Sequence, residues 1–434
     1  MSFEGEGSKE FLEAIQDSNV EKVKKVFGKF PKLANGRPEN GITCLHVAAN
    51  KGKLEIVKFL VEKEFDKDAK DASGDTPLLE ALSGKHVDVA RFLIEAGTDL
   101  DISNDNGQTA MHYAVRAGNP AVVRDLIVRG CDVNVTDNTG DTPLHDAIGQ
   151  NETSCAEIIL TSPILDLTIA NERGFNPLHW AAYHGKTGGA LFEKILQRNK
   201  NLLEVCMEQG PTPLHIAAIN DHAEEVKILI KKGANVNVKD TENEATPLHL
   251  ACSHAFIGAA KILVAAGADV NMGDVNKRTP LHVVMGSSEE VTDDSVGGVM
   301  GDLLKKLVKT TVGSKQSRIK LATFLLEHGA DVNARNKDGK TPVDVCTDKT
   351  LRKAVESFKK ESSKPPSFAK ALLCSKCFTR TADVTLLPCN HMMTCRECHK
   401  WVSTCPLCGG NVTKAVEEDA VEIAVAPSLD LTEK

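Results

Sequence analysis

Seven cysteines and one histidine stand in four close pairs near the C-terminus, within the stretch CSKCFTRTADVTLLPCNHMMTCRECHKWVSTCPLC. The pairs are Cys374/Cys377, Cys389/His391, Cys395/Cys398 and Cys405/Cys408. Thiolate and imidazole are the ligands that zinc prefers, and four of them fill one tetrahedral structural site. Eight ligands therefore predict two zinc ions. Because all four positions of each site are filled by protein, neither ion is expected to activate water.

The remaining six cysteines are scattered singly along the chain, without the close pairing that disulfides need. We expect buried, reduced thiols at Cys44, Cys131, Cys155, Cys206, Cys252 and Cys346. Disulfides are the alternative for the dense C-terminal cluster, but tight C-x-x-C pairs in an intracellular chain are more often metal ligands.

Composition narrows the class of protein. Charged residues make up 26% of the chain and the formal net charge is −8, which argues against a nucleic-acid binder with a basic face. The N-terminus has no cationic segment followed by an apolar run, and 18 consecutive apolar residues occur nowhere. These features predict a soluble cytoplasmic protein without membrane insertion.

The elements that would carry this cluster repeat along most of the chain. The repeated pattern is TCLHVAA at 43, TPLLEAL at 76, TAMHYAV at 109, TPLHDAI at 142, NPLHWAA at 176, TPLHIAA at 212, TPLHLAC at 246, TPLHVVM at 279 and TPVDVCT at 341. This pattern resembles the ankyrin repeat, in which T-P-L-H-x-A recurs about every 33 residues. The resemblance implies an all-α ankyrin-repeat solenoid with short β-hairpins, spanning 1–358 in about ten units including caps.

One unit shows why helix pairs are expected. Thr142 is placed to cap a helix whose first turn contains Pro143, and Leu144 and Ala147 then share one face. Second helices are expected to end at left-handed glycines, namely Gly97, Gly130, Gly233, Gly267 and Gly329. A histidine stands at one fixed place in most units: His46, His112, His145, His179, His215, His249 and His282. Such regular histidines are expected to hydrogen-bond adjacent units and to take no part in catalysis.

Several segments depart from the repeat. The fifth and sixth repeats are long and irregular, and residues 286–318 form an insertion in repeat nine, either a docking loop or a tolerated surface insertion. Residues 359–373 are polar and contain proline and serine, which predicts a linker. The zinc-binding segment is expected at 374–412, with a flexible tail at 413–434.

The four pairs, with a C-x-H second pair, resemble the RING finger. In that family the first and third pairs hold one zinc ion, and the second and fourth pairs hold the other. The resemblance assigns Cys374, Cys377, Cys395 and Cys398 to the first ion. It assigns Cys389, His391, Cys405 and Cys408 to the second.

The resemblance also implies a function. RING fingers bind a ubiquitin-conjugating enzyme charged with ubiquitin and orient its thioester, without a covalent intermediate or catalytic nucleophile of their own. The matching contact positions here are Ser375, Lys376, Trp401, Pro406 and Leu407. The ankyrin-plus-RING order, with LPCNHMMTC and the irregular fifth and sixth repeats, resembles the mind bomb family of E3 ubiquitin ligases over residues 10–412, without that family's N-terminal substrate-binding modules.

The array is expected to bind the protein substrate through exposed positions of its first helices. Equivalent positions by register are Asn50, Arg116, Tyr183, Ile219 and Ser253. A non-enzymatic scaffold is the alternative, because Lys376 and Gly409 replace the apolar and basic residues usual in RING ligases. Independently of this choice, Val412 and Val416 could form a small contact surface for a homodimer through the RING.

Overall fold

The computed structural model describes residues 7–31, 41–185, 188–207, 210–286, 314–362, 384–387, 391–394, 414–417 and 422–424. Contacts along the chain divide the protein into two units, Met1–Phe358 and Lys359–Lys434. Among the helices of these residues, none combines the length and the apolar character that crossing a bilayer requires.

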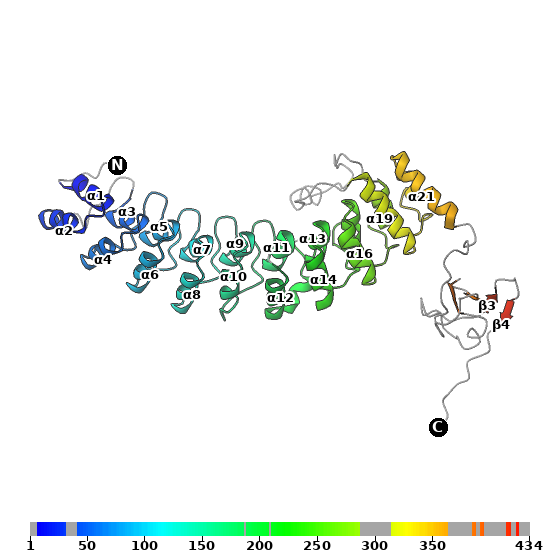
Figure 1. Cartoon of the computed structure of the whole chain (residues 1–434), viewed down its shortest axis with the longest axis horizontal. Helices are drawn as coiled ribbons and strands as arrows, with labels where there is room; N and C mark the ends of the chain where they lie inside the picture. The colour runs from blue at the N-terminus through cyan, green and yellow to red at the C-terminus, as the bar shows by residue number, and fades with distance from the viewer. Residues whose placement is uncertain are drawn as a thin grey trace, which may run out of the picture. The chain divides into compact units, whose positions relative to one another are not determined.

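The first unit is an array of helix pairs (Figure 1). Its first helices are α1 (Ser8–Gln16), α3 (Cys44–Asn50), α5 (Pro77–Ser83), α7 (Ala110–Arg116), α9 (Pro143–Gly149), α11 (Pro177–His184), α13 (Pro213–Ile219), α15 (Pro247–Ser253), α17 (Pro280–Gly286) and α20 (Pro342–Val345). Its second helices are α2 (Val20–Lys29), α4 (Leu54–Glu62), α6 (Val87–Glu95), α8 (Pro120–Val128), α10 (Thr153–Ile159), α12 (Gly188–Arg198), α14 (Ala223–Lys232), α16 (Ile257–Ala265), α19 (Lys315–Glu327) and α21 (Lys349–Ser362). Figure 1 shows the first helices α5 to α13 in one row and the second helices α6 to α14 in another.

The capping residues, first-turn prolines and helix-ending glycines take the conformations that the sequence predicts. Thr142 is in extended conformation, its side chain accepts the backbone N–H of His145, and Pro143 occupies the first turn of α9. Helix α14 ends at Gly233, whose φ of 101° lies in the left-handed region. The other four glycines predicted to end second helices also have positive φ.

One hydrophobic core runs the length of the array, from Phe11 to Val355. It is built by stacking of neighbouring units, since α3 packs on α5 and α13 on α15. At the N-terminal end, helices α1 and α2 lack the repeat pattern and pack through aromatic rings. The ring centroids of Phe11 and Phe65 are 6.3 Å apart, and those of Phe27 and Phe59 are 5.7 Å apart. Each unit therefore obtains its stability from the next, as a solenoid requires.

The short β-hairpins expected between units are not formed. The connections are tight turns, as where the Asp71 N–H donates to Asp75 O at 2.9 Å and the Gly74 N–H donates to Asp71 O at 3.0 Å. One further bond joins neighbouring turns, from the Asp105 N–H to Ser73 O at 2.9 Å. These isolated bonds do not make a continuous ladder, so the described part of the array contains no strand.

The segments that depart from the repeat pattern in sequence also depart from it in structure. After α12 the chain forms a short 3₁₀ helix, η2 (Lys200–Glu204), in place of the usual exit from a second helix. The insertion predicted at 286–318 falls between α17 and α19, and residues 287–313 lie outside the described residues.

The second unit contains four short strands. They are β1 (Val384–Leu387), β2 (His391–Thr394), β3 (Lys414–Glu417) and β4 (Glu422–Ala424), all antiparallel in the order β2-β1-β3-β4. Strands β3 and β4 lie in the stretch 413–434, for which the sequence predicts a flexible tail. Strand β3 pairs with β1, and β4 pairs with β3.

Candidate functional site

The repeated histidines join adjacent units. In unit four the Thr142 N–H donates to His145 Nδ1 at 3.2 Å, and His145 Nε2 lies 2.9 Å from the carbonyl oxygen of Phe175 in the next unit. The same bridge, with Nε2···O distances of 2.9 to 3.1 Å, is made by His46, His112, His145, His179, His215, His249 and His282. The predicted structural role is confirmed.

These partners fix the protonation of each ring. A backbone N–H can only donate and a carbonyl can only accept, so Nδ1 of His145 is unprotonated and Nε2 carries the hydrogen. Burial lowers the pKa of all seven imidazoles, and it lowers those of His179 and His215 to about 4. Burial therefore favours the neutral imidazole at all seven positions, and in six of the seven rings both nitrogens are hydrogen-bonded within the array.

Two units modify the bridge. In unit five Asn176 replaces threonine and caps the backbone N–H groups of Leu178 and His179, and His179 Nδ1 has no partner among the described residues. In unit two Leu79 stands at the histidine position and is 1% exposed. Leucine therefore fits this register sterically, a point that bears on mutagenesis below.

Two of the predicted substrate-binding residues are held by carboxylates of the next unit. Asn50 donates to Glu80 Oε2 at 2.6 Å. Arg116 donates from Nε to Asp146 Oδ2 at 2.9 Å and from a second nitrogen to Asp146 Oδ1 at 3.1 Å, with Asp137 at 3.3 Å. Burial raises the pKa of Asp146 to about 6 although the guanidinium opposes the shift. Both side chains are partly exposed and pre-positioned.

The other three predicted residues differ in exposure. Tyr183 is 8% exposed and stacks 5.6 Å from both Phe175 and Trp180. Ile219 is 1% exposed and belongs to a small hydrophobic cluster with Ala245 and Leu250. Ser253 is half-buried, with its hydroxyl donating to a backbone carbonyl at 2.8 Å. The expected exposure is thus wrong for Tyr183 and Ile219: rings of its own unit cover the tyrosine, and the isoleucine packs against residues of the next unit.

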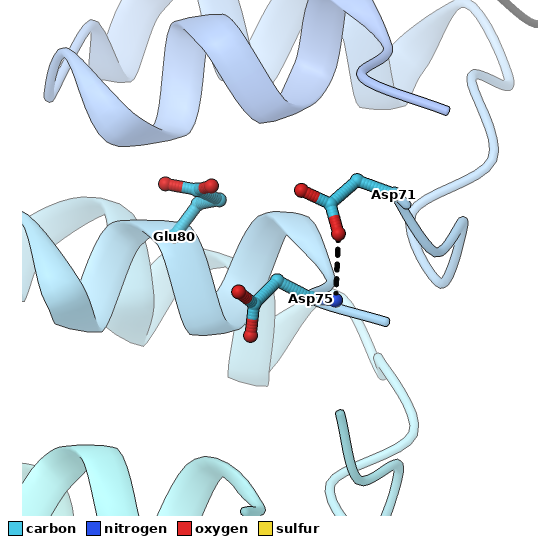
Figure 2. Close-up of side chains that lie close together, drawn as sticks. All are labelled: Asp71, Asp75 and Glu80. Carbon is cyan, nitrogen blue, oxygen red and sulfur yellow. Dashed lines mark hydrogen bonds between the residues drawn. The ribbon is translucent and has the colours of Figure 1, made fainter. Parts of the chain in front are cut away.

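Three carboxylates that the sequence analysis did not single out converge between units one and two (Figure 2). One oxygen from each of Asp71, Asp75 and Glu80 lies within 4.8 Å of the others. Each has hydrogen-bond donors: Asp71 accepts the Asp75 N–H, Asp75 accepts the Tyr113 hydroxyl at 3.1 Å, and Glu80 accepts Asn50. Burial, together with the Asp75 charge, raises the pKa of Tyr113 to about 12, so its hydroxyl stays protonated. The cluster is accounted for by bonds within the fold.

The array cysteines are free thiols. Cys44, Cys131, Cys155, Cys252 and Cys346 are buried as predicted, and burial raises the pKa of Cys44 to about 12 and that of Cys155 to about 11. Cys206 is exposed, against the prediction, because it follows the 3₁₀ turn η2 and lies outside the helix pair.

The candidate zinc centre lies in the second unit. Of its eight predicted ligands, His391 begins β2 and pairs with Leu386 of β1. The seven cysteine ligands and the predicted enzyme-contact residues Ser375, Lys376, Trp401, Pro406 and Leu407 lie outside the described residues. Seven thiols and one imidazole in close pairs are a donor set that suits zinc in its structural, closed form.

Comparison with known families identifies both parts of the chain. Ankyrin repeats, described in copies of three, match residues 11–104, 96–168, 111–202 and 178–274. A zinc finger of the C3HC4 type, the RING finger, matches residues 370–415, a span that includes all eight predicted ligands. RING fingers bind zinc.

Two curated relatives are E3 ubiquitin-protein ligases by name. The ligase MIB2 of Gallus gallus is 32% identical over 311 residues, which is 64% of this chain and 32% of the relative. The ligase mind-bomb of Drosophila melanogaster is 35% identical over 211 residues, 44% of this chain and 17% of the relative. The chain thus spans a third or less of these proteins. The human ASB11 ankyrin repeat domain, a crystal structure, superposes with a TM-score of 0.46 at 22% identity over 60% of this chain and all of that one.

Proposed function

Because the chain belongs to the ankyrin-repeat family and carries a C-terminal RING finger, we propose that it is an E3 ubiquitin-protein ligase whose array binds the protein substrate. The observation that carries the proposal is the RING match over residues 370–415. The names of the two relatives support the same activity.

The zinc sites in this proposal are structural. Cys374, Cys377, Cys395 and Cys398 would hold one ion, and Cys389, His391, Cys405 and Cys408 would hold the other. Bound zinc would supply the folding free energy that a segment of this length cannot obtain from its own core, on the order of 10 kcal/mol. No open coordination position remains for hydrolysis.

The finger would recruit a ubiquitin-charged conjugating enzyme. Ser375 and Lys376 lie between the first two ligands, Pro406 and Leu407 between the last two, and Trp401 lies between the third and fourth pairs. These positions would hold the enzyme so that its thioester faces a substrate lysine, and the rate gain would come from proximity and orientation.

The first helices of the array would bind the substrate. Asn50, Arg116 and Ser253 are partly exposed, and the first two are already held by Glu80 and Asp146. Side chains fixed before binding lose little conformational entropy, which favours their use in recognition. Tyr183 and Ile219 would contribute to the same surface only through the atoms that remain exposed.

Purified protein should be incubated with activating enzyme, a panel of conjugating enzymes, ubiquitin and ATP. We expect ubiquitin chains with the native protein and none with Cys389→Ser, which removes one ligand of the second site. Chain formation no greater than in that control, across the panel, would refute the ligase proposal. Metal analysis of the same samples should give two zinc ions per native chain.

Two residues favour a second candidate function, a non-enzymatic scaffold. Lys376 and Gly409 stand where RING ligases usually carry an apolar and a basic residue. In this alternative the finger would serve docking or a homodimer through Val412 and Val416. Zinc-replete protein that forms no chains with any conjugating enzyme, and that elutes as a dimer, would favour this function.

A further inference from the structure

A cavity of about 320 Å³ opens between the ends of the second helices of units two and three. These helices are α6 and α8, which lie side by side in the row of second helices (Figure 1). Asp99 and Asp101 line the cavity from the turn after α6, and Arg129, Gly130 and Cys131 line it from the turn after α8. Two carboxylates and one guanidinium leave the lining with a net negative charge.

At other joints of the array the same place is filled by a hydrogen-bond donor. Between units one and two, Lys67 Nζ donates to the carbonyl oxygens of Ala96 at 2.7 Å and Gly97 at 2.6 Å, at the C-terminal end of α6. At three later joints an asparagine side-chain amide has this role, and the donor–acceptor pairs, with N···O distances of 2.8 to 3.3 Å, are Asn134 with Ile164, Asn237 with Gly267 and Asn271 with Gly329. A carbonyl that follows a second helix is thus satisfied by the preceding unit.

The joint between units two and three lacks this donor. Leu100 stands in the register of the lysine of unit one, and Asp101 stands in the register of the asparagines. A carboxylate accepts hydrogen bonds but does not donate them, so Asp101 accepts the Asp132 N–H at 3.1 Å and offers nothing to the carbonyl oxygens beside it. Those oxygens belong to Arg129 and Gly130, and no described group donates to either of them.

The group that fits this place is a cation. Carbonyl oxygens at the C-terminal end of a helix carry a partial negative charge, and the Asp101 carboxylate lines the same cavity. A Cβ added at Gly97 would lie 3.6 Å from Lys67 Nζ, whereas one added at Gly130 would meet no described atom within 4 Å. The joint between units one and two therefore shows the chemistry that the equivalent carbonyls accept, which is a primary ammonium with three N–H donors.

We propose that this cavity binds a lysine side chain of a partner protein, whose ammonium donates to the carbonyl oxygens of Arg129 and Gly130 and to the Asp101 carboxylate. Ile94 and Leu100 line the same cavity and would contact the methylene groups of that side chain. The site lies at the ends of second helices, whereas the positions proposed for substrate binding lie on first helices. It requires neither zinc nor ligase activity.

The probe is Nα-acetyl-lysine N-methylamide, added to the isotope-labelled full chain at pH 7.5. Binding is followed by the NMR shifts of the backbone amides of Gly130, Cys131 and Asp132. The probe is raised to about 50 mM, above the millimolar dissociation constant expected of so small a ligand. Three comparison compounds are the uncharged Nε-acetyl form, the arginine analogue, and n-butylamine, which carries the ammonium without a peptide backbone.

Two variants supply the missing donor in ways that the array already uses. Leu100→Lys places an ammonium in the register of Lys67, and Asp101→Asn places an amide in the register of Asn134. Because neighbouring units accommodate both residue types, both variants should fold. Each should weaken binding of the lysine probe about tenfold or more. Asp88→Asn removes an exposed carboxylate from the first turn of α6, at its other end, and is the matched control.

We expect saturable shifts with the lysine probe in the native chain and in Asp88→Asn, and no such shifts with the Nε-acetyl form. Absence of saturable shifts in the native chain, or equal shifts with the neutral form, would overturn the proposal. Tighter binding of the arginine analogue would overturn the choice of an ammonium. Binding of n-butylamine that is tighter by more than about tenfold would mean that the cavity excludes a lysine held in a peptide chain. Native affinity in both Leu100→Lys and Asp101→Asn would overturn the assignment to this cavity.

Discussion

Replacing His215 with leucine tests whether the buried histidines are neutral bridges. His215 is fully buried, its Nδ1 accepts the Thr212 N–H at 3.2 Å, and its Nε2 lies 2.9 Å from Ala245 O in the next unit. Leu79 occupies the equivalent position in unit two, so leucine is expected to fit without overpacking. The substitution removes the partner of the Thr212 N–H, the Thr212 hydroxyl and the Ala245 carbonyl.

At pH 7.5 the loss of these hydrogen bonds should lower the free energy of unfolding by about 2–4 kcal/mol in total. In acid the difference in unfolding free energy between the native protein and the variant should become smaller, because the native protein is destabilised by protonation of His215 in the unfolded chain. Burial lowers the pKa of His215 from 6.5 to about 4, so the unfolded chain binds a proton that the folded protein does not. The stability from this group is therefore complete above pH 6.5 and falls as the pH falls, by about 2 kcal/mol at pH 5.0.

The variant has no imidazole at this position to take up the proton. The gap, meaning the difference in unfolding free energy between the native protein and the variant, should therefore narrow by about 2 kcal/mol between pH 7.5 and 5.0. Urea unfolding followed by far-ultraviolet circular dichroism measures the gap at both values. Hydrogen exchange of the α13 amides checks that the change is local, since repeat arrays open at their interfaces. The other bridging histidines titrate in both proteins and cancel.

Val128→Ala is the control, because Val128 is 79% exposed and contains no ionisable group. Its stability should stay within about 0.5 kcal/mol of the native value at both pH values. A gap for His215→Leu that is equally large at pH 7.5 and pH 5.0 would refute the reasoning, because it would mean that the imidazole is not held neutral. A gap below about 0.5 kcal/mol at pH 7.5 would refute the bridge itself.

Three other substitutions or reactions probe the array. Arg116→Ala should lower the free energy of unfolding by about 2 kcal/mol, because it leaves the buried Asp146 carboxylate without its cationic partner; the loss is limited because the arginine side chain is 34% exposed. Arg116→Lys should recover only part of this stability. An unchanged urea midpoint for Arg116→Ala would contradict the pairing. Gly28→Ala should stabilise α2 by about 0.5–1 kcal/mol, because a methyl group there meets open space. Gly233→Ala should instead destabilise the protein by about 1–2 kcal/mol, because φ is 101° at this position. Thermal melts in which both substitutions shift the melting temperature in the same direction would contradict this. Iodoacetamide at pH 7.5 should modify Cys206 before the buried array thiols, as peptide mass spectrometry would show, and equal rates would mean that the array opens globally.

The local signals of the repeat were sufficient to predict the helices. Thr142, Pro143 and Gly233 act within one or two turns of their own position, so the sequence indicates where helices begin and end. The bridging histidines could be recognised for the same reason, since their register is fixed by the pattern itself. The spacing of the cysteine pairs likewise indicated zinc and the RING family.

The tertiary structure decided what depends on contacts between distant residues. Tyr183 and Ile219 share the register of Arg116, yet the rings of Phe175 and Trp180 cover Tyr183 and aliphatic side chains of the next unit cover Ile219. Register alone carries no information on that packing. The convergence of Asp71, Asp75 and Glu80 likewise depends on how two units stack. Composition alone predicts a flexible acidic tail, but residues 414–417 pair with β1 and residues 422–424 pair with β3, so both segments are strands. The composition of a segment indicates how much apolar surface it can bury, but it does not identify the strand that will pair with its backbone N–H and C=O groups.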